Sequence, residues 1–235
     1  MNTVERVEYD TGLVMFKNVF SPELIKRFND EIDTLTAGCD SYPGKLLNEK
    51  AISIVSELRA LEEYRQVEKF CRRVSRLRYS ATFRKNPSDD VKCYIRCANA
   101  KSDSSSHLRH FDSYLMTILI PINIVTSPHD NGDLVVYRKK NFTTSVAGNV
   151  FRKTLTKFDN SLPLKYRRKK TLTQLENKLC DKIVCAVGNV YFFNGYNIKH
   201  CNFSVSSGER RTLLIHAYDP KNSLGLSDLV RKFRT

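Results

Sequence analysis

The chain has 235 residues and a mass of 27.1 kDa, the size of one domain or of one domain with a helical extension. Hydrophobic residues make up 41% of it, so it can bury a sizeable core and is not disordered as a whole. Lys and Arg total 39 against 25 Asp and Glu, and this net charge of +14 favours anionic partners: nucleic acid, acidic proteins or anionic small molecules. No apolar run reaches the length of about 18 residues that a membrane-spanning helix needs, and residues 1–20 lack the apolar core of a secretory signal, so we expect a cytoplasmic protein.

The first third of the chain predicts a strand followed by helices. Residues 11–20 are rich in strand-forming apolar side chains. The tripeptide Ser-Pro-Glu at 21–23 then provides a helix N-cap, a proline in the first turn and an acidic residue beside it, and the helix is expected to end near Gly38. Apolar residues at helical spacing predict a second helical stretch from about residue 49 to residue 77.

From residue 78 onward the pattern changes to the two-residue period of strands. Apolar and polar side chains alternate through residues 91–97, and turn signals such as Asn131-Gly132 separate the later apolar runs. The further predicted strands span 114–124, 133–137, 145–151, 182–187, 190–194 and 211–218. Helices followed by many short strands predict a mainly β fold, a sandwich or barrel with the N-terminal helices packed on one side.

Residues 138–182 stand apart as a basic insertion between two predicted strands. The insertion holds thirteen Lys or Arg against three acidic residues, so most of the excess charge of the chain lies there. One interpretation is a solvated surface segment, and the other is a surface that binds an anionic partner. Aromatic residues are interleaved with the basic ones, which is compatible with nucleic acid but does not single it out.

A metal site is predicted by histidine and aspartate, not by cysteine. The seven cysteines are scattered and form no pair of CxxC motifs, which disfavours structural zinc. His110 and Asp112 lie two residues apart just before an apolar strand, so both side chains can face one ion. His200 begins the turn before the last strand and is the candidate third ligand. Two imidazoles and one carboxylate form the facial set that binds non-haem Fe(II) and leaves open positions.

Two adjacent arginines follow the three candidate metal ligands in the sequence. Arg210 stands ten residues after His200, at the head of an apolar strand, where a guanidinium can hold a carboxylate through two hydrogen bonds. Arg211 follows immediately and is the alternative. Adjacent residues of a strand point to opposite faces, so only one of the two can enter the site, and we favour Arg210.

Together these residues resemble the Fe(II)- and 2-oxoglutarate-dependent oxygenases, in their prolyl-hydroxylase-like and phytanoyl-hydroxylase-like branches. The resemblance covers roughly residues 91–218 and includes the HxD motif, the distant His and the Arg about ten residues later. It also includes the strands DSYLMTILIPIN, NGDLVVY and VGNVYFFNGYNIKH. The resemblance implies a double-stranded β-helix, the jelly-roll or cupin-like core, behind N-terminal helices.

The resemblance further implies what each residue does. His110, Asp112 and His200 would hold Fe(II), and Arg210 would bind the distal carboxylate of 2-oxoglutarate, with Arg211 as the alternative. Tyr94 could donate its hydroxyl to 2-oxoglutarate. The cosubstrates would be 2-oxoglutarate and O2, and no catalytic residue is expected beyond the metal site. An intact aspartate in the motif argues for hydroxylation or a related oxidation and against halogenation.

The remaining histidines have plainer interpretations. His107 lies in a Ser-rich loop and is expected to be exposed, and His129 lies in a turn. His216 is inside the last strand, on the same side as Arg210, where a hydrogen-bonded core histidine is the usual explanation.

We therefore expect a single oxygenase domain, residues 1–235. Its parts are an N-terminal strand and supporting helices (1–77), a double-stranded β-helix core (78–218) that carries the basic insertion (138–182), and a C-terminal tail (219–235). The expected reaction is hydroxylation of an unactivated C–H of a small metabolite or amino acid, anionic or tethered to a carrier. The alternatives are an oxygenase that modifies a protein side chain or nucleic acid, and a non-catalytic β-barrel binding module.

Overall fold

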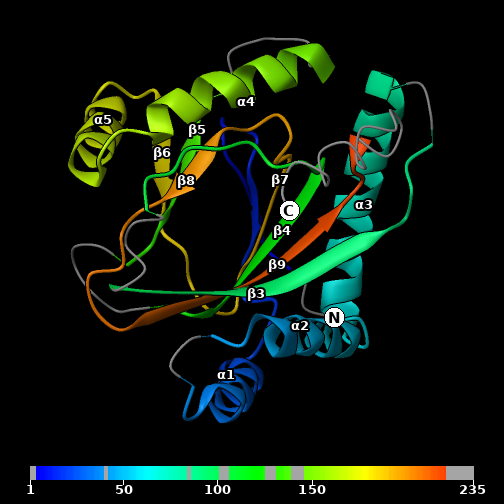
Figure 1. The fold of residues 1–235 in the computed structure, drawn as a ribbon. Coiled ribbons are helices and arrows are strands. Elements are labelled where there is room, and N and C mark those ends of the chain that lie inside the picture. The colour runs from blue at the N-terminus through cyan, green and yellow to red at the C-terminus, as the bar shows by residue number, and fades with distance from the viewer. Residues whose placement is uncertain are drawn as a thin grey trace.

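A computed structural model describes residues 4–39, 42–83, 86–100, 106–124, 131–138 and 146–220. The elements run from two short strands through three helices into a strand-rich half that is interrupted by two more helices (Figure 1). The predicted position of His129, and the predicted tail from residue 221 onward, lie outside the described residues.

The N-terminal strand and helix form as the sequence predicts. β1 (Arg6–Glu8) and β2 (Val14–Phe16) pair antiparallel and lead into α1 (Pro22–Thr36). The Ser21 hydroxyl caps this helix by accepting the backbone N–H of Leu24 at 3.2 Å. The buried face of α1 is formed by Ile25, Phe28 and Ile32.

The second predicted helix is two helices, α2 (Gly44–Leu58) and α3 (Glu62–Phe83). The chain turns at residues 59–61, and the turn is fixed because Arg59 donates two hydrogen bonds, at 2.9 and 2.8 Å, to the buried carboxylate of Glu68. The apolar face changes at this turn, so a single helix could not bury both apolar stretches. Ile52, one of the apolar residues of the predicted stretch from 49 to 77, is exposed.

Two antiparallel sheets make the rest of the fold. The larger sheet has the order β1-β2-β7-β4-β9-β3, and the smaller has the order β6-β5-β8. The strands not yet introduced are β3 (Val91–Asn99), β4 (Met116–Asn123), β5 (Leu134–Tyr137), β6 (Cys180–Ile183), β7 (Val190–Phe193), β8 (His200–Asn202) and β9 (Glu209–Ala217). The predicted fold class, a double-stranded β-helix with N-terminal helices, is confirmed.

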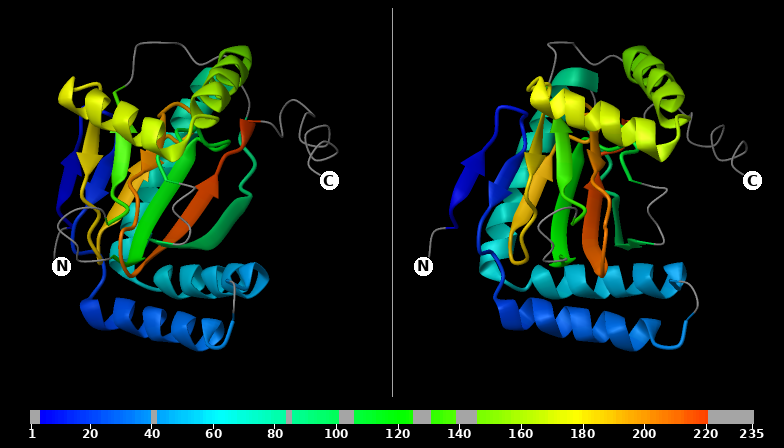
Figure 2. Two further views of the ribbon diagram at one scale, coloured as in Figure 1. Left: turned by 60° about the vertical axis from the view of Figure 1, so that its left-hand side comes forward. Right: turned by 90° about the vertical axis from the view of Figure 1, so that its left-hand side faces the viewer.

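In the described part of the basic insertion, two helices form between residues 146 and 176, so the predicted strand at 145–151 is wrong. Residues of this segment belong to α4 (Val146–Asn160), which is followed by α5 (Leu164–Glu176). The apolar residues Phe151, Leu155 and Phe158 repeat at helical spacing beyond the short window from which the strand was predicted. Figure 2 shows α4 and α5 on the opposite side of the molecule from α1 and α2.

Alternate side chains of each strand point to opposite faces of the sheet, so one set packs in the core and the other set faces the candidate site. On β4 the even-numbered apolar residues, such as Ile118 and Ile120, pack in the core cluster with the residues of α1–α3. On β9 the residues Leu213 and Ile215 do the same. Thr117 of β4 and the even-numbered residues of β9 therefore face the space between the two sheets.

None of the helices in the described part of the chain has the length and apolar character of a membrane-spanning helix.

Candidate metal centre

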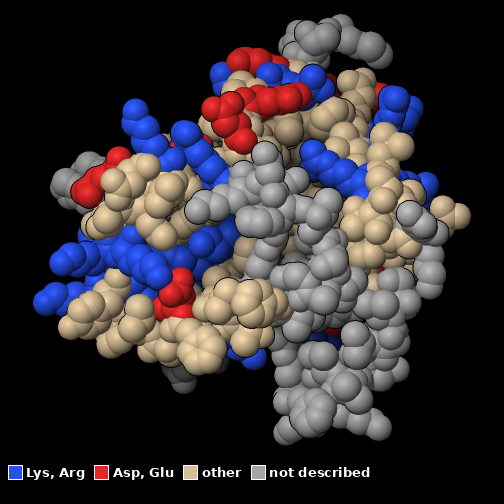
Figure 3. All heavy atoms as spheres, turned by 90° about the horizontal axis from the view of Figure 1, so that it is seen from above, with Lys and Arg blue, Asp and Glu red and all other residues tan. Residues whose placement is uncertain are grey.

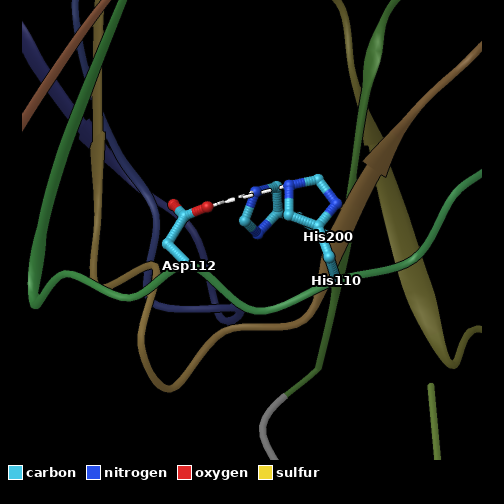
Figure 4. A group of neighbouring side chains, drawn as sticks. All are labelled: His110, Asp112 and His200. Carbon is cyan, nitrogen blue, oxygen red and sulfur yellow. Dashed lines mark ion pairs between the residues drawn. The ribbon is translucent and has the colours of Figure 1, made fainter. Parts of the chain in front are cut away.

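Three side chains converge between the sheets, as Figure 4 shows. His110 Nε2 lies 3.7 Å from Asp112 Oδ1, and His200 Nε2 lies 3.6 Å from the same oxygen. Two ligand atoms that each lie about 2.1 Å from one ion can be at most about 4.2 Å apart, so each of these two nitrogen–oxygen pairs is close enough to bind the same ion. Within the described parts of the chain this is the one His/Cys/Asp/Glu group that could hold a metal, and its ligand atoms all lie within 4.8 Å of one another.

Backbone pairing holds the two imidazoles side by side. The N–H of His110 donates to the carbonyl of His200 at 2.9 Å, and the N–H of His200 donates back at 3.0 Å. The ring centroids are 4.2 Å apart. An isolated β-bridge thus aligns these two candidate ligands, although many residues separate them in the sequence.

The tautomers of both histidines suit metal binding. His110 Nδ1 lies 3.0 Å from the carbonyl oxygen of Leu108, and His200 Nδ1 lies 3.0 Å from that of Ile198. A carbonyl can only accept, so each Nδ1 carries the hydrogen and each Nε2 of the neutral ring keeps a lone pair. Both lone pairs belong to the nitrogen atoms that face Asp112, and a hydrogen bond from the other ring nitrogen to a carbonyl commonly orients a metal-binding histidine in this way.

Asp112 is held so that one of its oxygens stays available. Thr117 Oγ1 donates to Asp112 Oδ2 at 2.6 Å, and the Asp112 N–H donates to the carbonyl of Gly195 at 2.8 Å. A β-carbon added at Gly195 would lie 2.1 Å from Asp112 Oδ2, so only glycine leaves room for the carboxylate. The sequence marked Gly195 only as part of a turn signal and gave no hint of this contact.

The protonation states agree with this geometry. Burial, followed by the neighbouring His200, lowers the pKa of His110 to about 4, so this imidazole is neutral near pH 7. Burial alone would raise the pKa of Asp112, but the histidines around it and the Thr117 hydroxyl lower that pKa overall. A neutral imidazole and an ionised carboxylate are the forms that bind a divalent cation.

A relay of hydrogen bonds leads from Asp112 to Tyr94. Thr117 has used its hydrogen on Asp112, so His216 Nδ1 donates to Thr117 Oγ1 at 3.1 Å. His216 Nε2 is then the acceptor for the Tyr94 hydroxyl at 3.0 Å. His216 is therefore hydrogen-bonded at both ring nitrogens, while the one proton of Tyr94 is engaged by His216. The role of Tyr94 toward 2-oxoglutarate stays a prediction.

The two adjacent arginines point to different places. Arg210 lines the cavity that contains the metal group, which is the set His110, Asp112 and His200, and it is 3% exposed. Its Nε and Nη2 have no hydrogen-bond partner within the described residues. Burial lowers the pKa of this guanidinium. Arg211 is also buried, but it is fully engaged outside the cavity: it donates to Asn29 at 2.7 Å and to Asp33 and Glu209 at 2.6 to 3.0 Å.

The expectation that His107 is exposed is wrong. His107 is 0% exposed and stacks edge-on against Phe203, with ring centroids 5.1 Å apart. Its backbone N–H donates to the carbonyl of Asn202, which extends the pairing of this segment with β8. Local polarity suggested a loop, whereas the long-range strand pairing buries the ring.

Arg109 is a site residue that the sequence did not reveal. It is fully buried beside His110, and its guanidinium donates to the Tyr137 hydroxyl at 2.8 Å and to the Thr171 hydroxyl and the Arg167 carbonyl at 2.9 Å. The side chain of Asn160 also makes two hydrogen bonds to the backbone of Arg109. The helices of the basic insertion are thereby attached directly to the segment that carries His110.

Solved structures match this chain, although no protein-family model and no curated protein does. EvdO2 from Micromonospora carbonacea var. aurantiaca, also solved in complex with 2-oxoglutarate, matches with a TM-score of 0.51 and 12% identity over 93% of this chain and 94% of that chain. A prolyl-4-hydroxylase from Pseudomonas putida matches with a TM-score of 0.47 and 10% identity over 88% and 92%. HygX from Streptomyces hygroscopicus, with nickel and 2-oxoglutarate bound, matches with a TM-score of 0.45 and 13% identity over 90% and 84%. The likeness to EvdO2 shows that this chain and EvdO2 share one fold.

Proposed function

We propose that the protein is an Fe(II)- and 2-oxoglutarate-dependent oxygenase that hydroxylates an unactivated C–H of a small metabolite or amino acid. The observation that carries this proposal is the convergence of His110 Nε2, His200 Nε2 and Asp112 Oδ1 on one point of a cavity. The same cavity is lined by Arg210, a buried guanidinium whose Nε and Nη2 have no partner among the described residues. Sharing a fold with EvdO2, which binds 2-oxoglutarate in its crystal, agrees with this assignment.

The residues present fit both cofactors. His110, Asp112 and His200 would hold the metal, since two neutral imidazoles and one carboxylate suit Fe(II) and leave coordination positions open. Arg210 would bind the distal carboxylate of 2-oxoglutarate, which satisfies the two guanidinium nitrogens that are buried without partners in the described part of the chain. When bound, the iron would supply the activation of O2 and the oxidation of the substrate C–H.

The rest of the cavity orients the ligands and excludes water. Leu119, Leu134 and Phe193 provide apolar walls beside the metal group, and Phe193 packs edge-on against the His200 ring with centroids 4.9 Å apart. Thr117 fixes the carboxylate of Asp112, which leaves Oδ1 as the oxygen for the metal. The intact carboxylate supports hydroxylation as the outcome, not halogenation.

Succinate formation from 2-oxoglutarate tests the proposal. We expect air-exposed protein with Fe(II) to convert 2-oxoglutarate to succinate slowly without a second substrate, and we expect His110→Ala to lose this activity because the ion loses a ligand. Fe(II) or Mn(II) binding is measured in parallel by calorimetry under anaerobic conditions. Wild-type protein that binds neither metal nor 2-oxoglutarate would contradict the proposal and favour a non-catalytic β-barrel.

A carrier-tethered or macromolecular substrate is a second candidate, and a surface groove favours it. The groove has a volume of ≈ 610 Å³ and lies along α5, next to Ser204. Its apolar residues are Leu164 and Leu172, and three basic side chains, Lys165, Arg168 and Lys169, line it beside them. Figure 3 shows Lys and Arg side chains gathered on this face of the molecule. A basic groove with apolar side chains suits an acidic partner that carries the substrate.

Neutralising the groove distinguishes the two candidates. In the combined variant Lys165→Gln, Arg168→Gln and Lys169→Gln we expect the KM for a carrier-bound substrate to rise about tenfold and to lose much of its salt dependence. Uncoupled succinate formation is expected to stay unchanged, because the three side chains lie outside the metal cavity. The control variant removes three exposed charges from α2 and α3: Lys45→Gln, Lys69→Gln and Arg73→Gln. Equal KM values in the two variants would reduce the groove to a solvated surface.

A further inference from the structure

Arg96 is a second guanidinium in the metal cavity, and no described carboxylate pairs with it. Asp112 is the one acidic residue among the side chains that line this cavity, and its two oxygens already face the histidines and Thr117. Arg96 and Arg210 therefore place two positive charges in a cavity whose one described acidic side chain is already engaged. Such an arrangement favours the binding of more than one anionic group.

The strand register defines where Arg96 stands. Arg96 on β3 is directly opposite Thr212 on β9 and diagonal to Arg210, which pairs with Ala98. Diagonal neighbours across two antiparallel strands are about 7–8 Å apart. Arg96 and Tyr94 are two residues apart on one strand, so both face the space between the sheets. Arg96 therefore faces the same side as Tyr94, the residue that the resemblance singles out.

Arg96 also lies where two cavities meet. One cavity contains the metal group, and a neighbouring cavity is lined by Arg96, Arg210, Asn202 and the side chains of Asn99 and Ser106. Among the described residues, none that lines this second cavity is acidic. Arg96 is only partly buried, whereas Arg210 is 3% exposed. Arg210 thus suits an enclosed cosubstrate carboxylate, and Arg96 is the more accessible of the two cations that line both cavities.

Asn202 faces the same space from the other sheet. It is two residues after the metal ligand His200 on β8, so the two side chains lie on one face of the strand. Asn202 lines both cavities, and its side-chain oxygen is buried without a hydrogen-bond partner among the described residues. Its amide can present N–H donors after a rotation that exchanges its oxygen and nitrogen.

We infer that Arg96 and Asn202 bind an oxyanion group, a carboxylate or phosphate, of the substrate, and so determine that the enzyme acts on anionic molecules. This inference rests on the proposed function, because Arg210 is assigned there to the 2-oxoglutarate carboxylate. With that carboxylate bound at Arg210, Arg96 remains as the unpaired cation beside the reacting centre. A substrate anchored there is held with its neighbouring carbon atoms near the metal.

Binding of two small anions tests the inference. Inorganic phosphate and acetate are titrated by calorimetry into Mn(II)-loaded protein that is saturated with 2-oxoglutarate, and also into metal-free protein. We expect phosphate or acetate to bind wild type and to bind Arg96→Gln about tenfold more weakly or not at all. Arg73→Gln, which removes an exposed positive charge from α3, is the matched control and is expected to bind like wild type.

The dissociation constant of 2-oxoglutarate separates the possible outcomes. We expect it to be the same in Arg96→Gln and in wild type. A loss of 2-oxoglutarate affinity in Arg96→Gln would overturn the inference, because Arg96 would then belong to the cosubstrate site. Anion binding that is absent, or that is equal in wild type and Arg96→Gln, would also overturn it. A wild-type protein that binds neither metal nor 2-oxoglutarate would contradict the proposed function, whereas Arg96-dependent anion binding to the metal-free protein would still identify the anion site.

Succinate formation then gives the substrate-level test. Candidate substrates are supplied as matched pairs that differ only in one acidic group, such as an acid and its amide or a phosphate ester and its alcohol. We expect only the anionic member to stimulate succinate formation by wild-type protein, and Arg96→Gln to require about tenfold more of it. Equal stimulation by the neutral members would overturn the inference.

Discussion

Gly195→Ala is expected to weaken metal binding by about 10- to 100-fold, although Gly195 is not itself a ligand. The added methyl group would lie 2.1 Å from Asp112 Oδ2 and 2.5 Å from Thr117 Oγ1, and real atoms cannot approach so closely. The Asp112 carboxylate must then move, because the Asp112 backbone is held in place by the hydrogen bond from its N–H to the carbonyl of Gly195. Calorimetric titration with Fe(II) or Mn(II) without oxygen measures the effect.

Two further variants make the Gly195 result interpretable. Gly44→Ala is the matched control, because nothing lies within 4 Å of a β-carbon added there, and we expect wild-type metal affinity. Asp112→Asn keeps the shape of the side chain but removes its charge, and it is expected to lose at least as much affinity as Gly195→Ala. If Gly195→Ala stays folded by thermal unfolding and binds metal as tightly as wild type, Asp112 is not a ligand.

Most of the candidate ligand set is accessible from sequence because its signal is local. His110 and Asp112 share a face through the two-residue period of an extended segment, and the same period places Arg210 and Arg211 on opposite faces. His200 is the candidate third ligand because it begins the turn before the last strand, and the resemblance agrees with that choice. Strand parity also placed His216 on the side of Arg210, and both residues line the metal cavity.

What the sequence could not predict depends on contacts between distant segments. The close approach of Gly195 to Asp112 exists only after β7 and β4 have paired, so a glycine in a turn signal looks like any other. The burial of His107 and Arg109 likewise follows from the pairing of their segment with β8 and from α4 and α5. The predicted strand at 145–151 failed for another reason: a window of seven residues is too short to separate strand from helix.

Arg210→Gln is expected to weaken 2-oxoglutarate binding by about a hundredfold or more, while Arg211→Gln leaves it unchanged. Arg210 lines the cavity with two unpartnered guanidinium nitrogens, and an Arg–carboxylate pair held by two charge-assisted hydrogen bonds is worth several kcal/mol. Arg211 instead binds Asn29 and Asp33 of α1, so its loss is expected to lower the free energy of unfolding by about 1–2 kcal/mol.

The stability of the protein without 2-oxoglutarate gives an independent check. Arg211→Gln is expected to lower this stability, whereas Arg210→Gln is not. Burial lowers the pKa of Arg210, which means that its charge is poorly compensated when no carboxylate is bound. Arg210→Gln is therefore expected to be at least as stable as wild type without 2-oxoglutarate, and to lose the rise in Tm that 2-oxoglutarate gives to wild type. Gly132 packs against the Arg210 side chain and has a positive φ of 79°. A β-carbon at Gly132 would clash with Arg210, so the close packing of this glycine restricts the position of the Arg210 side chain. Unchanged 2-oxoglutarate affinity in Arg210→Gln together with a loss in Arg211→Gln would reverse the assignment of the two residues.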